Sequence, residues 1–240
     1  MIKRIPQSVI IIFLTIILML MIFILSVMND SLSEAWISEV STHEPLTVVL
    51  DAGHGGEDGG AIGKNNVYEK DLNLLITMKI GKILENNGIN VVYTRTTDTL
   101  LYNKNEDYKN KKKALDLAER VKIAQKYENS IFISIHMNSF SQSDTRGFQI
   151  YYSKNDPESR IIADQIQNAV KNKLQPSNRR KTVDSTSRIY LLKNIKTPAI
   201  LIECGFLSNP EECKLLSTEK YQNDLSVTIA DEIIRYINKK

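Results

Sequence analysis

The pattern of apolar and polar positions begins with one long segment that carries no charge. Residues 8–28, SVIIIFLTIILMLMIFILSVM, are apolar or uncharged throughout. As a helix rising 1.5 Å per residue, such a segment spans about 30 Å, the thickness of a bilayer core. We expect it to cross a membrane as an anchor or uncleaved signal, although SLS at 31–33 leaves cleavage open. Lys3 and Arg4 favour a cytosolic location for residues 1–7 and an exported body.

The rest of the chain alternates between strand and helix patterns after a short connection. Residues 29–45 are mixed and polar and end at Pro45, which predicts a linker, and residues 46–240 are expected to form one catalytic domain. Short apolar, β-branched runs predict strands at 46–51, 89–94, 131–136, 147–152, 188–192 and 198–203. Helical spacing predicts helices at 69–86, 111–128, 157–173 and 219–238.

This alternation predicts an α/β fold with a mostly parallel twisted sheet of about six strands, flanked by helices on both faces. The strands at 131–136 and 147–152 are too close in sequence for a helical crossover. We therefore expect these two strands to pair antiparallel at one side of the sheet.

Polar side chains stand at the carboxyl ends of three predicted strands. His54 lies just beyond the first strand of the domain, His136 ends the third, and Glu203 ends the last. Glu69 begins the helix that follows the glycine-rich segment GHGGEDGG. Because the carboxyl ends of parallel strands share one edge of a sheet, we expect two imidazoles and two carboxylates to meet there.

Two imidazoles and one carboxylate around an open fourth position form a catalytic zinc site. Zn²⁺ makes a bound water more acidic, and a second carboxylate that does not bind the metal can take the proton. Each residue alone also has a simpler explanation. His54 could bond to loop backbone, His136 could be a satisfied core histidine, and Glu69 could be an acid at a helix start. Their joint placement favours the zinc site.

Composition and charge limit the kinds of binding partner that the sequence indicates. The formal net charge of +3 over 240 residues gives no indication of a nucleic-acid partner. The basic clusters KNKKK at 109–113 and NRRK at 178–181 are typical of a solvated helix face and a solvated loop, with an anionic polymer or membrane surface as the alternative. Cys204 and Cys213 could form a disulfide, but Cys204 follows an apolar run where a free buried thiol is common.

Four segments together resemble the zinc-dependent N-acetylmuramoyl-L-alanine amidases. They are LDAGHGGEDGGAIG, YEKDLNL, FISIHMNS and PAILIECGFLSNPEE, and the resemblance covers nearly all of residues 46–238. It implies hydrolysis of the amide between the lactyl group of muramic acid and L-alanine in peptidoglycan. It also implies that His54, Glu69 and His136 bind Zn²⁺ and that Glu203 is the catalytic glutamate.

Further segments, among them RGFQIYYS and RRKTVDSTSRIYLLKN, are similar to the germination-specific amidases of spore-forming bacteria. This implies removal of stem peptides from spore cortex for muramic δ-lactam formation, by a protein anchored in the membrane or secreted into the envelope. A vegetative wall amidase and another zinc peptidase or deacetylase are the alternatives. Whether an accessory envelope protein is a partner stays open.

Substrate contacts are predicted from position alone. Asn138, Arg95 and Arg120 lie near strand ends or on the facing helix, where they could touch glycan or peptide. For the two arginines, a structural ion pair is the alternative.

Overall fold

The computed structural model describes residues 7–40, 45–102 and 111–239. Lys3, Arg4 and the first two residues of the KNKKK cluster lie outside the described residues, as do positions 41–44 of the predicted linker. The chain divides into two units, Met1–Glu44 and Pro45–Lys240.

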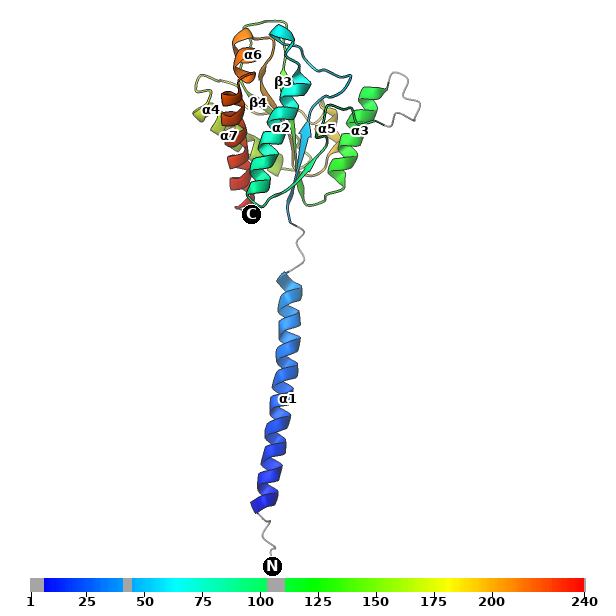
Figure 1. Cartoon of the computed structure of the whole chain (residues 1–240), viewed down its shortest axis with the longest axis vertical. Coiled ribbons are helices and arrows are strands. Elements are labelled where there is room, and N and C mark those ends of the chain that lie inside the picture. The colour runs from blue at the N-terminus through cyan, green and yellow to red at the C-terminus, as the bar shows by residue number, and fades with distance from the viewer. Residues whose placement is uncertain (1–6, 41–44, 103–110, 240) are drawn as a thin grey trace, which may run out of the picture. The chain divides into compact units, whose positions relative to one another are not determined.

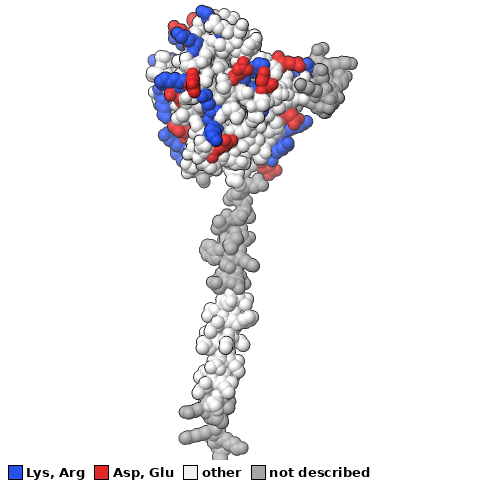
Figure 2. All heavy atoms as spheres, in the orientation of Figure 1, with Lys and Arg blue, Asp and Glu red and all other residues white. Residues whose placement is uncertain are grey.

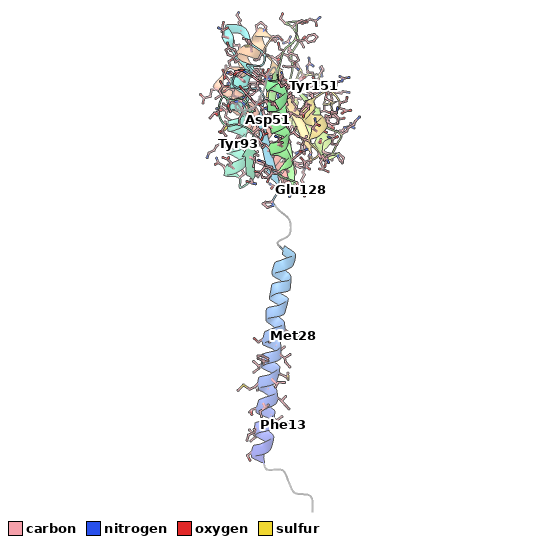
Figure 3. The ribbon with its side chains drawn as sticks, turned by 90° about the vertical axis from the view of Figure 1, so that its right-hand side faces the viewer. Phe13, Met28, Asp51, Tyr93, Glu128 and Tyr151 are labelled. Carbon is pink, nitrogen blue, oxygen red and sulfur yellow. The ribbon has the colours of Figure 1, made fainter. Side chains whose placement is uncertain are left out.

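The described part of the first unit is one helix, α1 (Gln7–Val40). Its stretch Ile11–Met28 has a mean hydropathy of 3.1, and its apolar side chains, Phe13 and Met28 among them, project on all sides (Figure 3). Length and composition therefore allow this helix to cross a membrane, and a signal segment has the same properties. The helix continues to Val40, so most of the segment predicted as a linker is helical.

The second unit contains a six-stranded, mostly parallel sheet in the order β2-β1-β3-β6-β4-β5. β2, β1, β3 and β6 are parallel to one another, whereas β4 is antiparallel to β6 and parallel to β5. The predicted fold class is therefore confirmed. The strands are β1 (Thr47–Ala52), β2 (Asn90–Tyr93), β3 (Ser130–Asn138), β4 (Gln149–Tyr152), β5 (Val183–Asp184) and β6 (Ala199–Phe206).

Two predictions about the strands were wrong. The strand at 147–152 pairs with β6 rather than with β3, because β6 lies between them and forms a long parallel ladder with β3. The run at 188–192 is not a strand: helix α5 (Tyr190–Asn194) forms there and buries Leu191 and Leu192. Periodicity cannot separate a short strand from a single helical turn.

Helices cover the two faces of the sheet unequally (Figure 1). α2, α4 and α7 pack on one face and bury the larger apolar core, while α3 and α5 cover the other face over a smaller core around Phe132 and Leu201. On this second face the apolar core ends where the strands approach their carboxyl ends. The helices are α2 (Glu69–Asn86), α3 (Lys112–Gln125), α4 (Glu158–Lys173), α5, α6 (Pro210–Leu216) and α7 (Glu219–Ile237), with a 3₁₀ turn η1 (Lys64–Asn66).

Charges on the second unit are intermixed. On the face that Figure 2 shows, basic and acidic side chains lie next to one another, without a broad region of one sign. The role of a single arginine on this unit therefore depends on its immediate partners rather than on a common field.

Candidate metal centre

His54 lies directly beyond β1 in a backbone conformation that few residues adopt. Its φ is +61°, in the left-handed region, and Gly55 and Gly56 follow with φ values of +140° and +53°. This turn lies at the carboxyl end of β1, where the side chains that follow neighbouring strands converge. The glycines thus allow a non-glycine residue to hold its imidazole at the rim of the sheet.

Two other glycines make room for the ligands themselves. A Cβ atom on Gly53 would lie 2.2 Å from the ring of His136, and one on Gly60 would lie 2.5 Å from a carboxylate oxygen of Glu69. Both contacts are closer than any side chain allows. The glycine-rich segment is therefore packed against the candidate metal ligands.

Glu69, the first residue of α2, brings the two imidazoles together. Its Oε1 lies 3.2 Å from Nε2 of His54 and 3.0 Å from Nδ1 of His136. One ligand atom from each of these three residues lies within 4.8 Å of the other two. The backbone N–H groups of Ala61 and Met137 donate to the carboxylate and fix its orientation. The structure therefore brings together the three residues that the sequence predicted as ligands.

Electrostatics at this cluster favour positive charge. Burial would lower the pKa of His54, but Asp58 and Glu69 together raise it to about 9. Burial would likewise raise the pKa of Glu69, but His136 and His54 hold it well below its usual range. The same carboxylates that favour a proton on His54 would favour a divalent cation between the ligands.

Asp58 is a residue of this site that sequence reasoning missed. Its Oδ2 lies 2.8 Å from Nδ1 of His54, although the two groups do not have the alignment of a hydrogen bond. A carboxylate beside the far nitrogen of a ligating histidine sets the orientation of the ring and its basicity. The signal in the sequence was an acid four residues after His54, within a glycine-rich loop.

The donor set fits Zn²⁺. Two imidazole nitrogens and one carboxylate oxygen are ligands that zinc binds in catalytic sites with an open fourth position. The side chains of His54 and His136 keep 15% and 17% of their surface exposed, so the cluster is reachable from solvent. A cavity of about 130 Å³ adjoins both rings.

Glu203 stands beside the ligands on the neighbouring strand. It is the register partner of His136 in the parallel β3–β6 pair, so both side chains project from the same face of the sheet. Its Oε2 is fully covered and has no hydrogen-bond partner among the described residues. Burial, with a further contribution from Glu69, raises the pKa of Glu203 to about 7. A carboxyl of this kind exchanges protons near neutral pH.

For Arg120, the structure favours the structural ion pair over the predicted contact with substrate. Only 1% of Arg120 is exposed, and its guanidinium pairs with Asp51 at 2.5 Å and Asp116 at 2.8 Å. It also donates to the backbone carbonyls of Ala52 and His54, both at 2.8 Å. Arg120 therefore fixes the backbone of the His54 turn.

Arg95 has a similar position on the other side of this turn. Only 3% exposed, it donates to the carbonyl of Ala52 at 2.8 Å and to that of Gly53 at 3.0 Å. Burial and these backbone partners favour a structural role for Arg95 over the predicted contact with substrate. Of the three predicted substrate contacts, only the side chain of Asn138 remains half-buried at the rim, where its Oδ1 accepts from the N–H of Ser139.

Asp51 completes the support beneath the metal centre. It is fully buried, and its carboxylate accepts hydrogen bonds from Ser134 at 2.5 Å and Thr94 at 2.6 Å besides its ion pair with Arg120. Burial alone would raise the pKa of Asp51, but Arg120, Ser134 and Thr94 lower it below its usual value. Asp51, the second-last residue of β1, is therefore a structural residue.

Comparison with known proteins gives a consistent result. A family described as N-acetylmuramoyl-L-alanine amidase matches residues 48–235. The germination-specific N-acetylmuramoyl-L-alanine amidase of Bacillus subtilis is 36% identical over 193 residues, which are 80% of each chain. The CwlD amidase of Clostridioides difficile, solved in complex with the GerS lipoprotein, is 39% identical.

The match to CwlD has a TM-score of 0.76 and covers 81% of this chain and 99% of that one. The amidase AmiC2 of Nostoc punctiforme is 31% identical, with a TM-score of 0.69 and coverage of 82% and 99%. The matched segments include the whole region that carries His54, Glu69, His136 and Glu203. The chain therefore belongs to the N-acetylmuramoyl-L-alanine amidase family of hydrolases.

Proposed function

We propose that this amidase is zinc-dependent, with His54, Glu69 and His136 as metal ligands and Glu203 as the general base. The substrate is the amide between the lactyl group of muramic acid and L-alanine. The observation that carries this proposal is the position of Glu203: a carboxylate oxygen without a hydrogen-bond partner among the described residues, on the strand next to His136.

Each residue of the site has a separate role in the proposed amide hydrolysis. Bound Zn²⁺ supplies Lewis acidity toward the carbonyl and makes a water molecule more acidic. Oε2 of Glu203 accepts a proton from the attacking water and returns it to the nitrogen of L-alanine as the C–N bond breaks. Asp58 orients the His54 ring, while Arg95 and Arg120 hold the turn beneath it.

Analysis of the cleaved bond tests the reaction. The full-length, zinc-loaded protein should produce new amino termini on L-alanine when it digests purified peptidoglycan. Labelling of free amines followed by mass spectrometry measures this. Release of acetate would indicate a deacetylase, and amino termini on other residues would indicate a peptidase. Either result would reject the proposed specificity.

The biological setting is a second proposal, supported by the names of the relatives. One relative is a germination-specific amidase, and CwlD was solved with a lipoprotein bound. We infer that this protein removes stem peptides from spore cortex, outside the cytoplasmic membrane, together with an accessory envelope protein. In this arrangement α1 is a membrane anchor and residues 1–7 are cytosolic. Spore cortex from a deletion strain should lack muramic δ-lactam by mass spectrometry, and normal levels would favour a vegetative wall amidase.

A further inference from the structure

A row of polar side chains leads away from the metal centre across three strands. β3, β6 and β4 are neighbours in the sheet, and His136, Glu203 and Gln149 are register partners across them. Register partners project from the same face, and adjacent strands lie about 4.8 Å apart. Gln149 therefore stands about 10 Å from His136, on the face that carries the candidate ligands.

Arg180 extends this row by one more side chain. Its Nη1 donates to Oε1 of Gln149 at 2.8 Å, and its Nε donates to the carbonyl of Arg146, also at 2.8 Å. The guanidinium lies 4.5 Å from the ring centre of Phe206, near the end of β6. Two hydrogen bonds and a stacked ring hold the plane of the guanidinium in a fixed orientation.

Gln149 holds the side chain of Arg180 in place through hydrogen bonds. Its Oε1 accepts from Arg180 and, at 3.4 Å, from the hydroxyl of Tyr151, while its amide group donates to the carbonyl of Lys181 at 3.0 Å. Tyr151 comes from the same strand, and Figure 3 labels it. Gln149 is only 8% exposed, so its polar groups are used within the protein. Its role is to fix Arg180 relative to Glu203.

Arg180 forms no ion pair among the described residues, although the carboxylate of Glu212 is near enough to interact with its charge. Within residues 7–40, 45–102 and 111–239, no carboxylate lies at ion-pair distance from its guanidinium, and its Nη2 donates no hydrogen bond. The side chain is nevertheless half-buried. A partly buried guanidinium with free donors is suited to a planar anion, because two parallel N–H groups match the two oxygens of a carboxylate.

We propose that Arg180 binds a carboxylate of the stem peptide and so sets the substrate preference of the amidase site. This inference rests on the proposed function. Arg180 is bonded to Gln149, whose backbone lies about 10 Å from that of His136, and this separation corresponds to about three residues of extended peptide. The peptide side of the substrate carries carboxylates, whereas the glycan side offers mainly hydroxyl and acetamido groups.

Two muramoyl peptides test this assignment. They should differ only in whether the carboxylate about three residues from the scissile amide is free or amidated. The zinc-loaded, full-length protein should cleave the free acid with a KM about 10- to 100-fold lower, the effect expected for a charge-assisted hydrogen bond. The substitution Arg180→Gln should raise the KM for the free acid to that of the amide. Arg180→Lys, which keeps the charge without the planar fork, should give an intermediate value.

Arg179→Gln is the matched control, because Arg179 is the exposed neighbour and its loss changes the net charge equally. It should keep the preference of the wild-type protein. Zinc content and thermal midpoint of Arg180→Gln establish that the variant is folded. An equal loss of kcat/KM on both peptides, or a preference that survives in Arg180→Gln and Arg180→Lys, would overturn the inference. If the wild-type protein cleaves neither peptide, the proposed function fails first, and the inference with it.

Discussion

Charged side chains are fully paired on one side of the candidate metal centre and incompletely paired on the other. On the side of β1 and α3, Asp51, Arg120 and Asp116 are almost fully buried, and every charge has a partner at 2.5–2.8 Å. On the side of β6 and β4, Oε2 of Glu203 has no hydrogen-bond partner and the guanidinium of Arg180 forms no ion pair among the described residues. The paired side holds the backbone in place, and the unpaired side has polar groups that the described protein does not use.

The difference shows how to interpret a charged residue near an active site. A charge with a complete set of partners in the protein stabilises the fold and has no donors left for a ligand. A partly buried charge without an ion-pair partner costs stability, so its presence points to a function that involves the substrate. Substitutions on the paired side should therefore affect stability, and those on the unpaired side should affect catalysis.

The largest effect is expected at the boundary between the two sides. His136→Ala should lose both zinc and amidase activity, since only one imidazole and one carboxylate remain as ligands. Elemental analysis of the purified protein measures the metal. A variant that retains one zinc per chain would remove His136 from the ligand set.

Next in size is the loss of an ion pair on the paired side. Arg120→Met leaves Asp51 and Asp116 buried without their partner and should lower the free energy of unfolding by about 3–5 kcal/mol. Chemical denaturation of the full-length protein in detergent measures this. Lys122→Met, at an exposed position of the same helix, is the control and should change it by less than about 0.5 kcal/mol. If both variants are equally stable, Arg120 does not support the turn.

The smallest effect concerns pH. The folded pKa of Asp51 is lowered, so its ionised form contributes stability that is fully present above its unfolded pKa of about 3.9. That contribution is lost as the pH falls from there through the folded pKa. The thermal midpoint of the wild-type protein should therefore fall more steeply below about pH 4 than that of Asp51→Asn. Parallel curves for the two proteins would contradict a structural role of the ionised carboxylate.

The sequence predicted which candidate ligands lie together better than it predicted their surroundings. His54, Glu69, His136 and Glu203 could be assigned to one rim because the carboxyl ends of parallel strands coincide, whatever the details of packing. The roles of Arg95 and Arg120 could not be predicted, because position near a strand end does not say whether a side chain turns into the core or toward solvent.

The row from Gln149 to Arg180 could not be predicted from the sequence, because the order of the strands in the sheet was predicted incorrectly. The sequence suggested that the strand at 147–152 pairs with its predecessor, whereas it pairs with β6, which comes about fifty residues later in the chain. Only this pairing places Gln149 next to Glu203. The NRRK cluster was accordingly interpreted as a solvated loop, although Arg180 bonds to Gln149, the register partner of the proposed general base Glu203.

The most direct test of the central claim is the substitution Glu203→Gln, with zinc content and amidase rate measured on the same sample. The change removes a proton acceptor but keeps the shape of the side chain, and Glu203 is not among the ligands. The account predicts one zinc per chain and a kcat lower by about 10²- to 10⁴-fold on peptidoglycan. A zinc-loaded Glu203→Gln protein with the wild-type rate would contradict the assignment of Glu203 as the general base.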